Sequence, residues 1–125
     1  MGPLRCGISN KLKGRDAERY AEAYLQNQGL VLVERNYRCR FGEIDLIMRE
    51  EDVVVFIEVR MRASQVFGGA ASSITISKQG KLVRTARYYL ASLKSAPPCR
   101  FDVVLSSGNR GEGLEWIRNA FWEDA

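Results

Sequence analysis

Hydrophobic positions recur along the chain with two different periods, which separate predicted helices from predicted strands. Residues 15–28 carry apolar side chains at i, i+3, i+4, i+7 and i+8, which is typical of one helix face. These positions are Ala17, Tyr20, Ala21, Tyr24 and Leu25. Residues 30–37 predict a first strand, residues 42–49 alternate as a second, and the β-branched run at 53–60 predicts a third.

The second half of the chain predicts one more helix and two more strands. Ser77 is placed to cap a helix over residues 78–94. The apolar stripe of this helix comprises Leu82, Val83, Ala86, Leu90 and Leu93. Residues 100–105 and 114–117 predict the last two strands. The order α-β-β-β-α-β-β predicts a mixed α/β domain with helices packed on a sheet.

Length and composition limit the architecture and the chemistry. The 125 residues are 46% hydrophobic, which fits one domain, expected over residues 14–125, after a flexible basic tail over residues 1–13. No run approaches the ~18 apolar residues of a membrane span, and the start has no secretion signal, so we expect no membrane contact and a cytoplasmic location. The absence of histidine excludes Ser-His-Asp catalysis and histidine zinc sites.

Basic residues are concentrated in one segment. Lys and Arg number 19 against 15 Asp and Glu, a net charge of +4. Between Arg60 and Arg100 there are eight basic residues and no acidic one, which predicts a positive surface for a polyanion. The alternative is a charged face that only keeps the protein soluble. The candidate nucleic-acid-binding residues of the segment are Arg62, Lys78, Lys81, Arg84 and Arg87.

Two carboxylates fall opposite one another in the predicted hairpin of the second and third strands. If Glu51 and Asp52 form its two-residue loop, opposed residues have numbers that sum to 103, so Asp45 faces Glu58 with Cβ atoms about 5 Å apart. Strict alternation puts Glu43, Asp45 and Ile47 on one face of the second strand and Ile44, Leu46 and Met48 on the other.

A buried pair of like charges needs an explanation, and three remain open. Asp45 and Glu58 could hold a Mg²⁺ or Mn²⁺ ion, with Glu43 as a further candidate ligand. Glu58 could instead form a salt bridge with Arg60, or the two acids could share a proton. Glu18, at the edge of the first apolar stripe, could reach Asp45 or could be an ordinary solvated glutamate.

Several ordered motifs resemble the YraN family of bacterial proteins over about residues 14–121. They are the runs GEIDLI at 42–47, FIEVR at 56–60, FGG at 67–69, KQGKL at 78–82, RFDVV at 100–104 and LEWI at 114–117. The resemblance implies a restriction-endonuclease-like fold, an α-β-β-β-α-β core similar to archaeal Holliday-junction resolvases.

The same resemblance implies roles for individual residues. Asp45 and Glu58 would be metal ligands, Glu18 the carboxylate from the first helix, and position 60 the lysine of an Asp…Glu-x-Lys pattern. This sequence has Arg60 there, which stays charged and cannot act as a base but can stabilise phosphate charge.

Together these features predict a Mg²⁺- or Mn²⁺-dependent endonuclease acting on DNA or structured nucleic acid, with DNA the expected partner. Its catalytic residues would be Glu18, Asp45, Glu58 and Arg60. Because of Arg60, the alternative is a nucleic-acid-binding module with weak or absent catalysis on a nuclease scaffold. A protein-interaction domain with a basic face is a third interpretation. A homodimer would suit cleavage of two strands, but the sequence does not require one.

Overall fold

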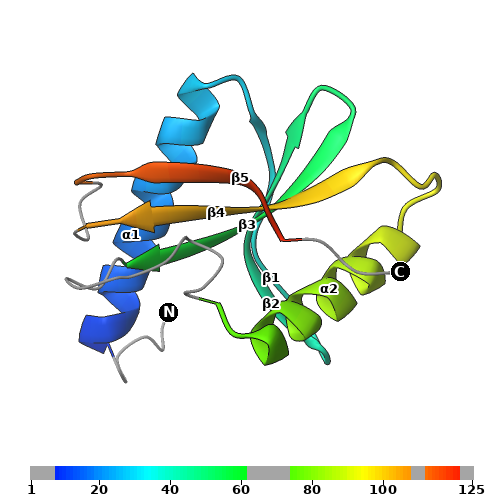
Figure 1. Ribbon diagram of the computed structural model, residues 1–125, viewed down its shortest axis with the longest axis horizontal. Helices are drawn as coiled ribbons and strands as arrows, with labels where there is room; N and C mark the ends of the chain where they lie inside the picture. The colour runs from blue at the N-terminus through cyan, green and yellow to red at the C-terminus, as the bar shows by residue number, and fades with distance from the viewer. Residues whose placement is uncertain (1–7, 62–73, 108–111, 122–125) are drawn as a thin grey trace.

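In the computed structural model, which describes residues 8–61, 74–107 and 112–121, a five-stranded mixed sheet is flanked by two helices (Figure 1). The elements are α1 (Ile8–Asn27), β1 (Val31–Cys39), β2 (Gly42–Glu50), β3 (Val53–Met61), α2 (Ile76–Ala91), β4 (Cys99–Ser106) and β5 (Glu115–Phe121). The strand order is β1-β2-β3-β4-β5, antiparallel except for the parallel pair β3 and β4, which α2 connects. The predicted α/β class and element order are confirmed, and the arrangement is consistent with a restriction-endonuclease-like core.

The two helices cover opposite faces of the sheet, because β3 sends alternate side chains to each. Val55 and Ile57 pack in the cluster that contains Ala21 and Leu25 of α1. Val54 and Phe56 pack in the cluster that contains residues of α2. The α2 cluster also holds Ile44, Ile47, Leu82, Ala86, Phe101, Val103, Leu105 and Phe121. β3 is therefore buried on both sides, which explains its continuous apolar run.

Helix α1 differs from its prediction in length and in one buried side chain. It begins at Ile8, so residues 8–13 are helical where a flexible tail was predicted, consistent with the helix propensity of the lysines and leucine among them. Tyr20, expected in the core, is 46% exposed. Glu22 is buried instead, because the Arg35 side chain of β1 donates two hydrogen bonds to its carboxylate, at 2.7 and 3.0 Å.

Helix α2 begins and ends earlier than predicted. Its N-cap is Thr75, whose Oγ1 accepts the backbone N–H of Lys78 at 3.1 Å, and Ser77 lies inside the helix. The helix ends at Ala91 instead of residue 94, where the backbone N–H of Ser92 caps it. Both shifts are one turn or less, which is the usual uncertainty of a helix end.

The hairpin of β2 and β3 has the predicted register as far as Leu46, but the predicted pair of Asp45 and Glu58 is not part of the ladder. Paired residues run from Glu50 opposite Val53 to Leu46 opposite Ile57, and each pair sums to 103. The predicted alternation fails one residue further on, because Ile44 packs in the α2 cluster with Ile47 whereas Leu46 packs under α1. β2 therefore changes its orientation at Asp45.

A buried polar network connects side chains of β2, β4 and β5. Asp102 is fully buried and accepts hydrogen bonds from Arg100 Nε at 3.0 Å, Trp116 Nε1 at 2.9 Å and the backbone N–H of Asn119 at 3.0 Å. Arg100 also donates to Glu50 at 2.7 Å. Arg100 thus belongs to the interior, and its inclusion in the predicted positive surface was wrong, because two carboxylates satisfy its charge.

Candidate active site

Asp45 lies where β2 separates from β3. Figure 1 shows β1 and β2 turning toward α2 while β3 continues beside β4. Here the Asp45 side chain accepts the backbone N–H of Val59 through Oδ2 at 2.8 Å. In the register of the hairpin Val59 would lie opposite Ile44, so the carboxylate bonds an N–H that an unbroken ladder would direct to β2. The separation of the strands and the position of the carboxylate are therefore linked.

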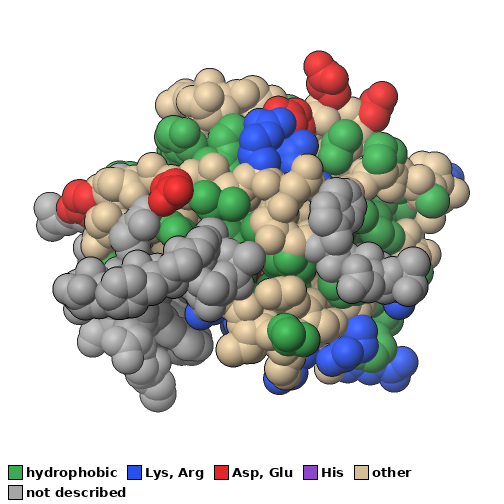
Figure 2. Space-filling model, in the orientation of Figure 1, with side chains coloured by type: hydrophobic (Ala, Val, Ile, Leu, Met, Phe, Trp, Pro, Cys, Tyr) green, Lys and Arg blue, Asp and Glu red, His purple; other side chains and the backbone are tan. Residues whose placement is uncertain are grey.

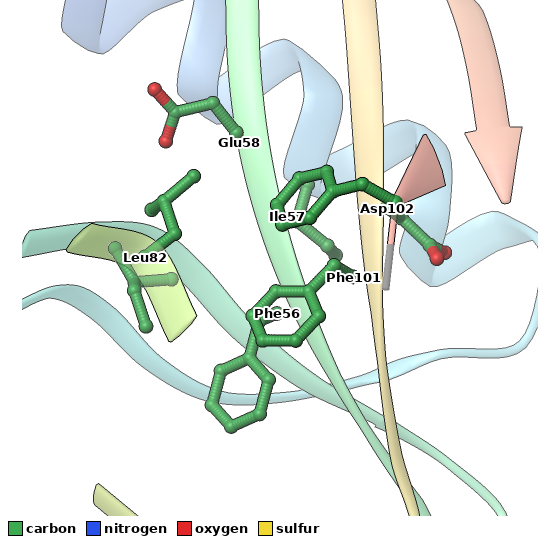
Figure 3. Close-up of a pocket in the computed structure, with 8 residues that line it drawn as sticks. Phe56, Ile57, Glu58, Leu82, Phe101 and Asp102 are labelled. Atoms are coloured by element: carbon green, nitrogen blue, oxygen red, sulfur yellow. The ribbon is translucent and has the colours of Figure 1, made fainter. Parts of the chain in front are cut away.

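Glu58 is the second acid of the site, and two cations reach it. Its side chain is 9% exposed, and Oε2 lies 3.3 Å from Nζ of Lys78 and 3.7 Å from Nη1 of Arg60. Figure 3 shows the Glu58 carboxylate pointing away from the apolar rings of Phe56 and Phe101. The Arg60 ion pair, one of the three alternatives left open, is present, and Lys78 of α2, which was predicted to bind phosphate, pairs with Glu58 as well.

Glu18 brings a third carboxylate from α1. Its Oε1 accepts a hydrogen bond of 2.9 Å from Nδ2 of Asn36. Asn36 has a left-handed backbone (φ 50°) and lies in β1 between residues paired with Leu46 and Ile44, so it flanks Asp45. Sequence reasoning missed Asn36. The available signal was an asparagine inside a predicted strand, since asparagine is disfavoured in strands and tolerates left-handed backbone.

Glu18 and Glu58 act electrostatically on Asp45, and the three acids are hereafter called the carboxylate cluster. The pKa of Asp45 is raised to about 8, first by burial and next by the charge of Glu58, while the Val59 hydrogen bond opposes the rise. Glu18 adds to it through charge and through a side-chain hydrogen bond. Burial is the largest cause of this rise, and the charges of Glu58 and Glu18 add to it although Lys78 and Arg60 lie beside Glu58.

The donor set of the cluster suits a hard divalent cation with incomplete protein coordination. Within residues 8–61, 74–107 and 112–121, no three Asp, Glu or Cys side chains are grouped so as to hold a metal ion by themselves. Mg²⁺ commonly takes one or two carboxylates and completes its shell with water and substrate phosphate. Asp45 and Glu58 fit that pattern. Glu43, the further candidate ligand, is exposed and forms a salt bridge of 2.9 Å with Arg38.

A basic face extends from the cluster along α2. Lys78 lies in the first turn of the helix, followed by the exposed Lys81, Arg84 and Arg87, hereafter the basic row. Figure 2 shows Lys and Arg side chains along the lower edge of the molecule, in the region of α2 and the β1–β2 turn, and a second group at the upper middle beside an acidic side chain. The visible acidic side chains lie at the upper and left edges. Arg62, predicted to belong to this face, lies outside the described residues.

Most of the chain, including the three acids and α2, falls within the range that known proteins match. The family described as "Uncharacterised protein family UPF0102" matches residues 17–105, which is most of the chain. The chain belongs to the UPF0102 family. This confirms the resemblance stated from the sequence motifs.

UPF0102 relatives cover almost the whole domain. A UPF0102 protein of Nitrosospira multiformis is 67% identical over 111 residues, which are 89% of this chain and 93% of the relative. One from Nitrosomonas europaea is 68% identical over 111 residues, 89% of this chain and 94% of the relative. One from Cupriavidus metallidurans is 57% identical over 120 residues, 95% and 87% of the two chains. These names state no reaction, so the function of this UPF0102 protein must be argued from its site.

Among the described residues, no helix is both long enough and apolar enough to cross a membrane.

Proposed function

We propose that this UPF0102 protein is a divalent-metal-dependent endonuclease that hydrolyses phosphodiester bonds in DNA or structured nucleic acid. The observation that carries the proposal is the convergence of Glu18, Asp45 and Glu58 beside a helix whose exposed face is basic. Buried carboxylates close to one another favour a bound cation, and a neighbouring row of basic side chains favours the phosphates of a polyanion. The two features together suit a phosphodiester held across a metal ion.

The position of each residue suggests a separate role in catalysis. Asp45 and Glu58 would hold a Mg²⁺ or Mn²⁺ ion, which when bound would neutralise phosphate charge and lower the pKa of a water molecule. Glu18 lies at the α1 side of Asp45, where its carboxylate can accept a hydrogen bond from such a water. Asn36 holds Glu18 in place through its 2.9 Å hydrogen bond.

Lys78 supplies the lysine that position 60 lacks. Its ammonium lies 3.3 Å from the Glu58 carboxylate, closer than the Arg60 guanidinium at 3.7 Å. An ammonium group has three donors, so Lys78 can contact Glu58 and still donate to a phosphate oxygen or a water. Arg60 can stabilise the charge that develops on the phosphate.

The test is a cleavage assay on labelled single-stranded, duplex and branched DNA and on RNA, with Mg²⁺ or Mn²⁺. Wild-type protein should cut at least one substrate, and Asp45→Asn should lower the rate by at least about 10³-fold because a ligand charge is lost. Glu43 is an exposed carboxylate of the same strand, so Glu43→Gln is the matched control. Its cleavage rate should stay within about twofold of the wild-type rate. Absence of wild-type cleavage on every substrate, or full activity of Asp45→Asn, would contradict the proposal.

A second candidate function is nucleic-acid binding with weak or no hydrolysis. It is favoured by the two cations that already neutralise Glu58, an arrangement that is complete without a metal. Arg60→Lys separates the two candidates. A gain of cleavage with unchanged binding affinity would show that arginine restrains catalysis and would support the second candidate. Equal or lower cleavage by Arg60→Lys, in a protein whose wild type already cuts, would support the first.

A further inference from the structure

The basic face continues from α2 onto the turn between β1 and β2. Gly42, at the start of β2, approaches α2 so closely that a Cβ atom there would lie 3.0 Å from Oγ1 of Thr85. Arg40 and Phe41 precede Gly42 and lie on the same side. The turn and the helix therefore form one continuous surface, although the contacting residues are more than 40 positions apart in the sequence.

Three side chains form an aromatic corner on this surface: Arg40, Phe41 and Tyr88. The Phe41 and Tyr88 rings meet edge to face, with centroids 5.7 Å apart, and the Arg40 guanidinium lies 5.0 Å from the Phe41 centroid. Tyr88 is nevertheless 48% exposed, and Arg40 is exposed. An aromatic surface that remains open to solvent beside a cation can stack a planar ligand.

The aromatic corner is collinear with the basic row. Lys81, Arg84 and Tyr88 follow i, i+3, i+7 spacing, which places them along one side of α2. Tyr88 lies ten residues beyond Lys78, about 15 Å along the helix axis. Among the described residues, Arg40, Lys81 and Arg84 form no salt bridge with a carboxylate. Their charge is therefore available to a polyanion.

We propose that the aromatic corner stacks an unpaired base, so that the nucleic acid bound along α2 is single-stranded at that point. Cations along a surface bind the backbone of any nucleic acid, whereas an exposed aromatic ring gains binding only from a base that is unstacked from its neighbours. A continuous duplex keeps its bases stacked inside and offers the corner only phosphates. The inference rests on the proposed function in one respect, that nucleic acid binds along the basic row.

The test compares the affinity of the protein for oligothymidylate and for a blunt duplex of equal length, by fluorescence anisotropy in EDTA at one fixed salt concentration. Tyr88→Ala and Tyr88→Leu should each weaken oligothymidylate binding about tenfold and change duplex binding by less than about twofold. Tyr88→Leu keeps apolar contact with Phe41 and guards against loss of the fold. Tyr88→Phe should retain wild-type affinity because it keeps the ring.

Two controls make the result specific to the corner. Tyr20→Ala removes a tyrosine of similar exposure (46%) on α1 and should change neither affinity. Lys81→Ala should weaken the binding of both ligands by a similar factor, because it removes a contact with the nucleic-acid backbone. Unchanged oligothymidylate binding by the Tyr88 variants, or an equal loss for duplex, would overturn this inference alone. Failure of wild type to bind either ligand would overturn it together with the proposed function, and failure to cleave would not affect it.

Discussion

Nζ of Lys78 in α2 lies 3.3 Å from Oε2 of the buried Glu58 in β3, and this ion pair connects the start of the basic helix to the carboxylate cluster. The two residues are 20 positions apart and belong to different elements. The side chain of Lys78 is 42% exposed, so it contacts both the buried acid and solvent. It therefore lies between the proposed metal ligands and the surface on which a phosphate backbone would run.

The role of Lys78 can be tested by comparing Lys78→Ala with Lys81→Ala, a substitution on the next turn of α2. Lys78→Ala should lower kcat by about 10²–10³-fold with a small change in KM, because the ammonium acts beside the reacting phosphate. Lys81→Ala should raise KM and leave kcat nearly unchanged, because it contacts only the bound backbone. Steady-state kinetics on the cleaved substrate measure both. An identical effect of the two substitutions would refute a distinct role for Lys78.

The raised pKa of Asp45 predicts a stability that depends on pH in the metal-free protein. The folded protein keeps the Asp45 proton up to about pH 8, whereas the unfolded chain loses it near pH 4. Between these values the folded state binds the extra proton, so this group makes stability fall as pH rises from about 4 to about 8. In EDTA, Asp45→Asn should therefore raise Tm by a few degrees at pH 8 and much less at pH 5.

At pH 8 a divalent cation should make wild type more stable than Asp45→Asn, the opposite of the order expected in EDTA. Mn²⁺ should raise the Tm of wild type, because a ligand that binds only the folded state stabilises it, and should leave Asp45→Asn nearly unchanged. Scanning calorimetry at the two pH values, with and without Mn²⁺, makes the comparison. A Tm gain for Asp45→Asn that does not vary with pH would argue against a protonated Asp45.

Gly42 and Gly80 form a matched pair for the contact between the β1–β2 turn and α2. Gly42 has φ +151°, which L side chains rarely adopt, and a Cβ atom there would lie 3.0 Å from Oγ1 of Thr85, so Gly42→Ala should destabilise the fold by about 1–3 kcal/mol. Gly80 lies inside α2, where a Cβ atom would meet only the tip of Arg84 at 3.6 Å. Gly80→Ala should therefore stabilise by up to about 1 kcal/mol. Urea unfolding measures both, and a stabilising Gly42→Ala would contradict the close approach.

The Asp102 network should be a determinant of stability. Asp102→Asn removes the charge that pairs with buried Arg100 and should lower the free energy of unfolding by about 3–5 kcal/mol. Asp16→Asn, at an exposed acid of α1, should change it by less than about 0.5 kcal/mol. Urea titration of both variants would test this, and a loss under 1 kcal/mol for Asp102→Asn would show that the network contributes little.

The sequence predicted most of the fold because its strands and helices are strongly periodic. The number and order of elements and the register of the β2–β3 hairpin all followed from apolar spacing and one short turn. The ends of α1 and α2 did not, because capping and helix propensity favour several start points that differ by little energy. Periodicity also missed the change in β2 at Asp45, which accompanies a hydrogen bond from the backbone of Val59 to the Asp45 side chain.

The site could be predicted only in part, because tertiary contacts position most of its side chains. Asp45 and Glu58 stood out because acids are costly within buried strands. Tertiary contacts decided the rest: Lys78 approaches Glu58 across 20 residues, Asn36 holds Glu18, and two carboxylates draw Arg100 into the interior. A charge count along the chain cannot distinguish a cation that faces solvent from one that pairs inside the fold.

Anomalous diffraction from a crystal of the wild-type protein soaked in Mn²⁺ tests directly whether Asp45 and Glu58 hold a metal ion. A peak is expected between the two residues, with carboxylate oxygens of both at coordination distance, about 2.1 Å. Asp45→Asn should give no such peak. An empty position in wild type, with Lys78 still paired to Glu58, would contradict a metal-dependent site in this protein.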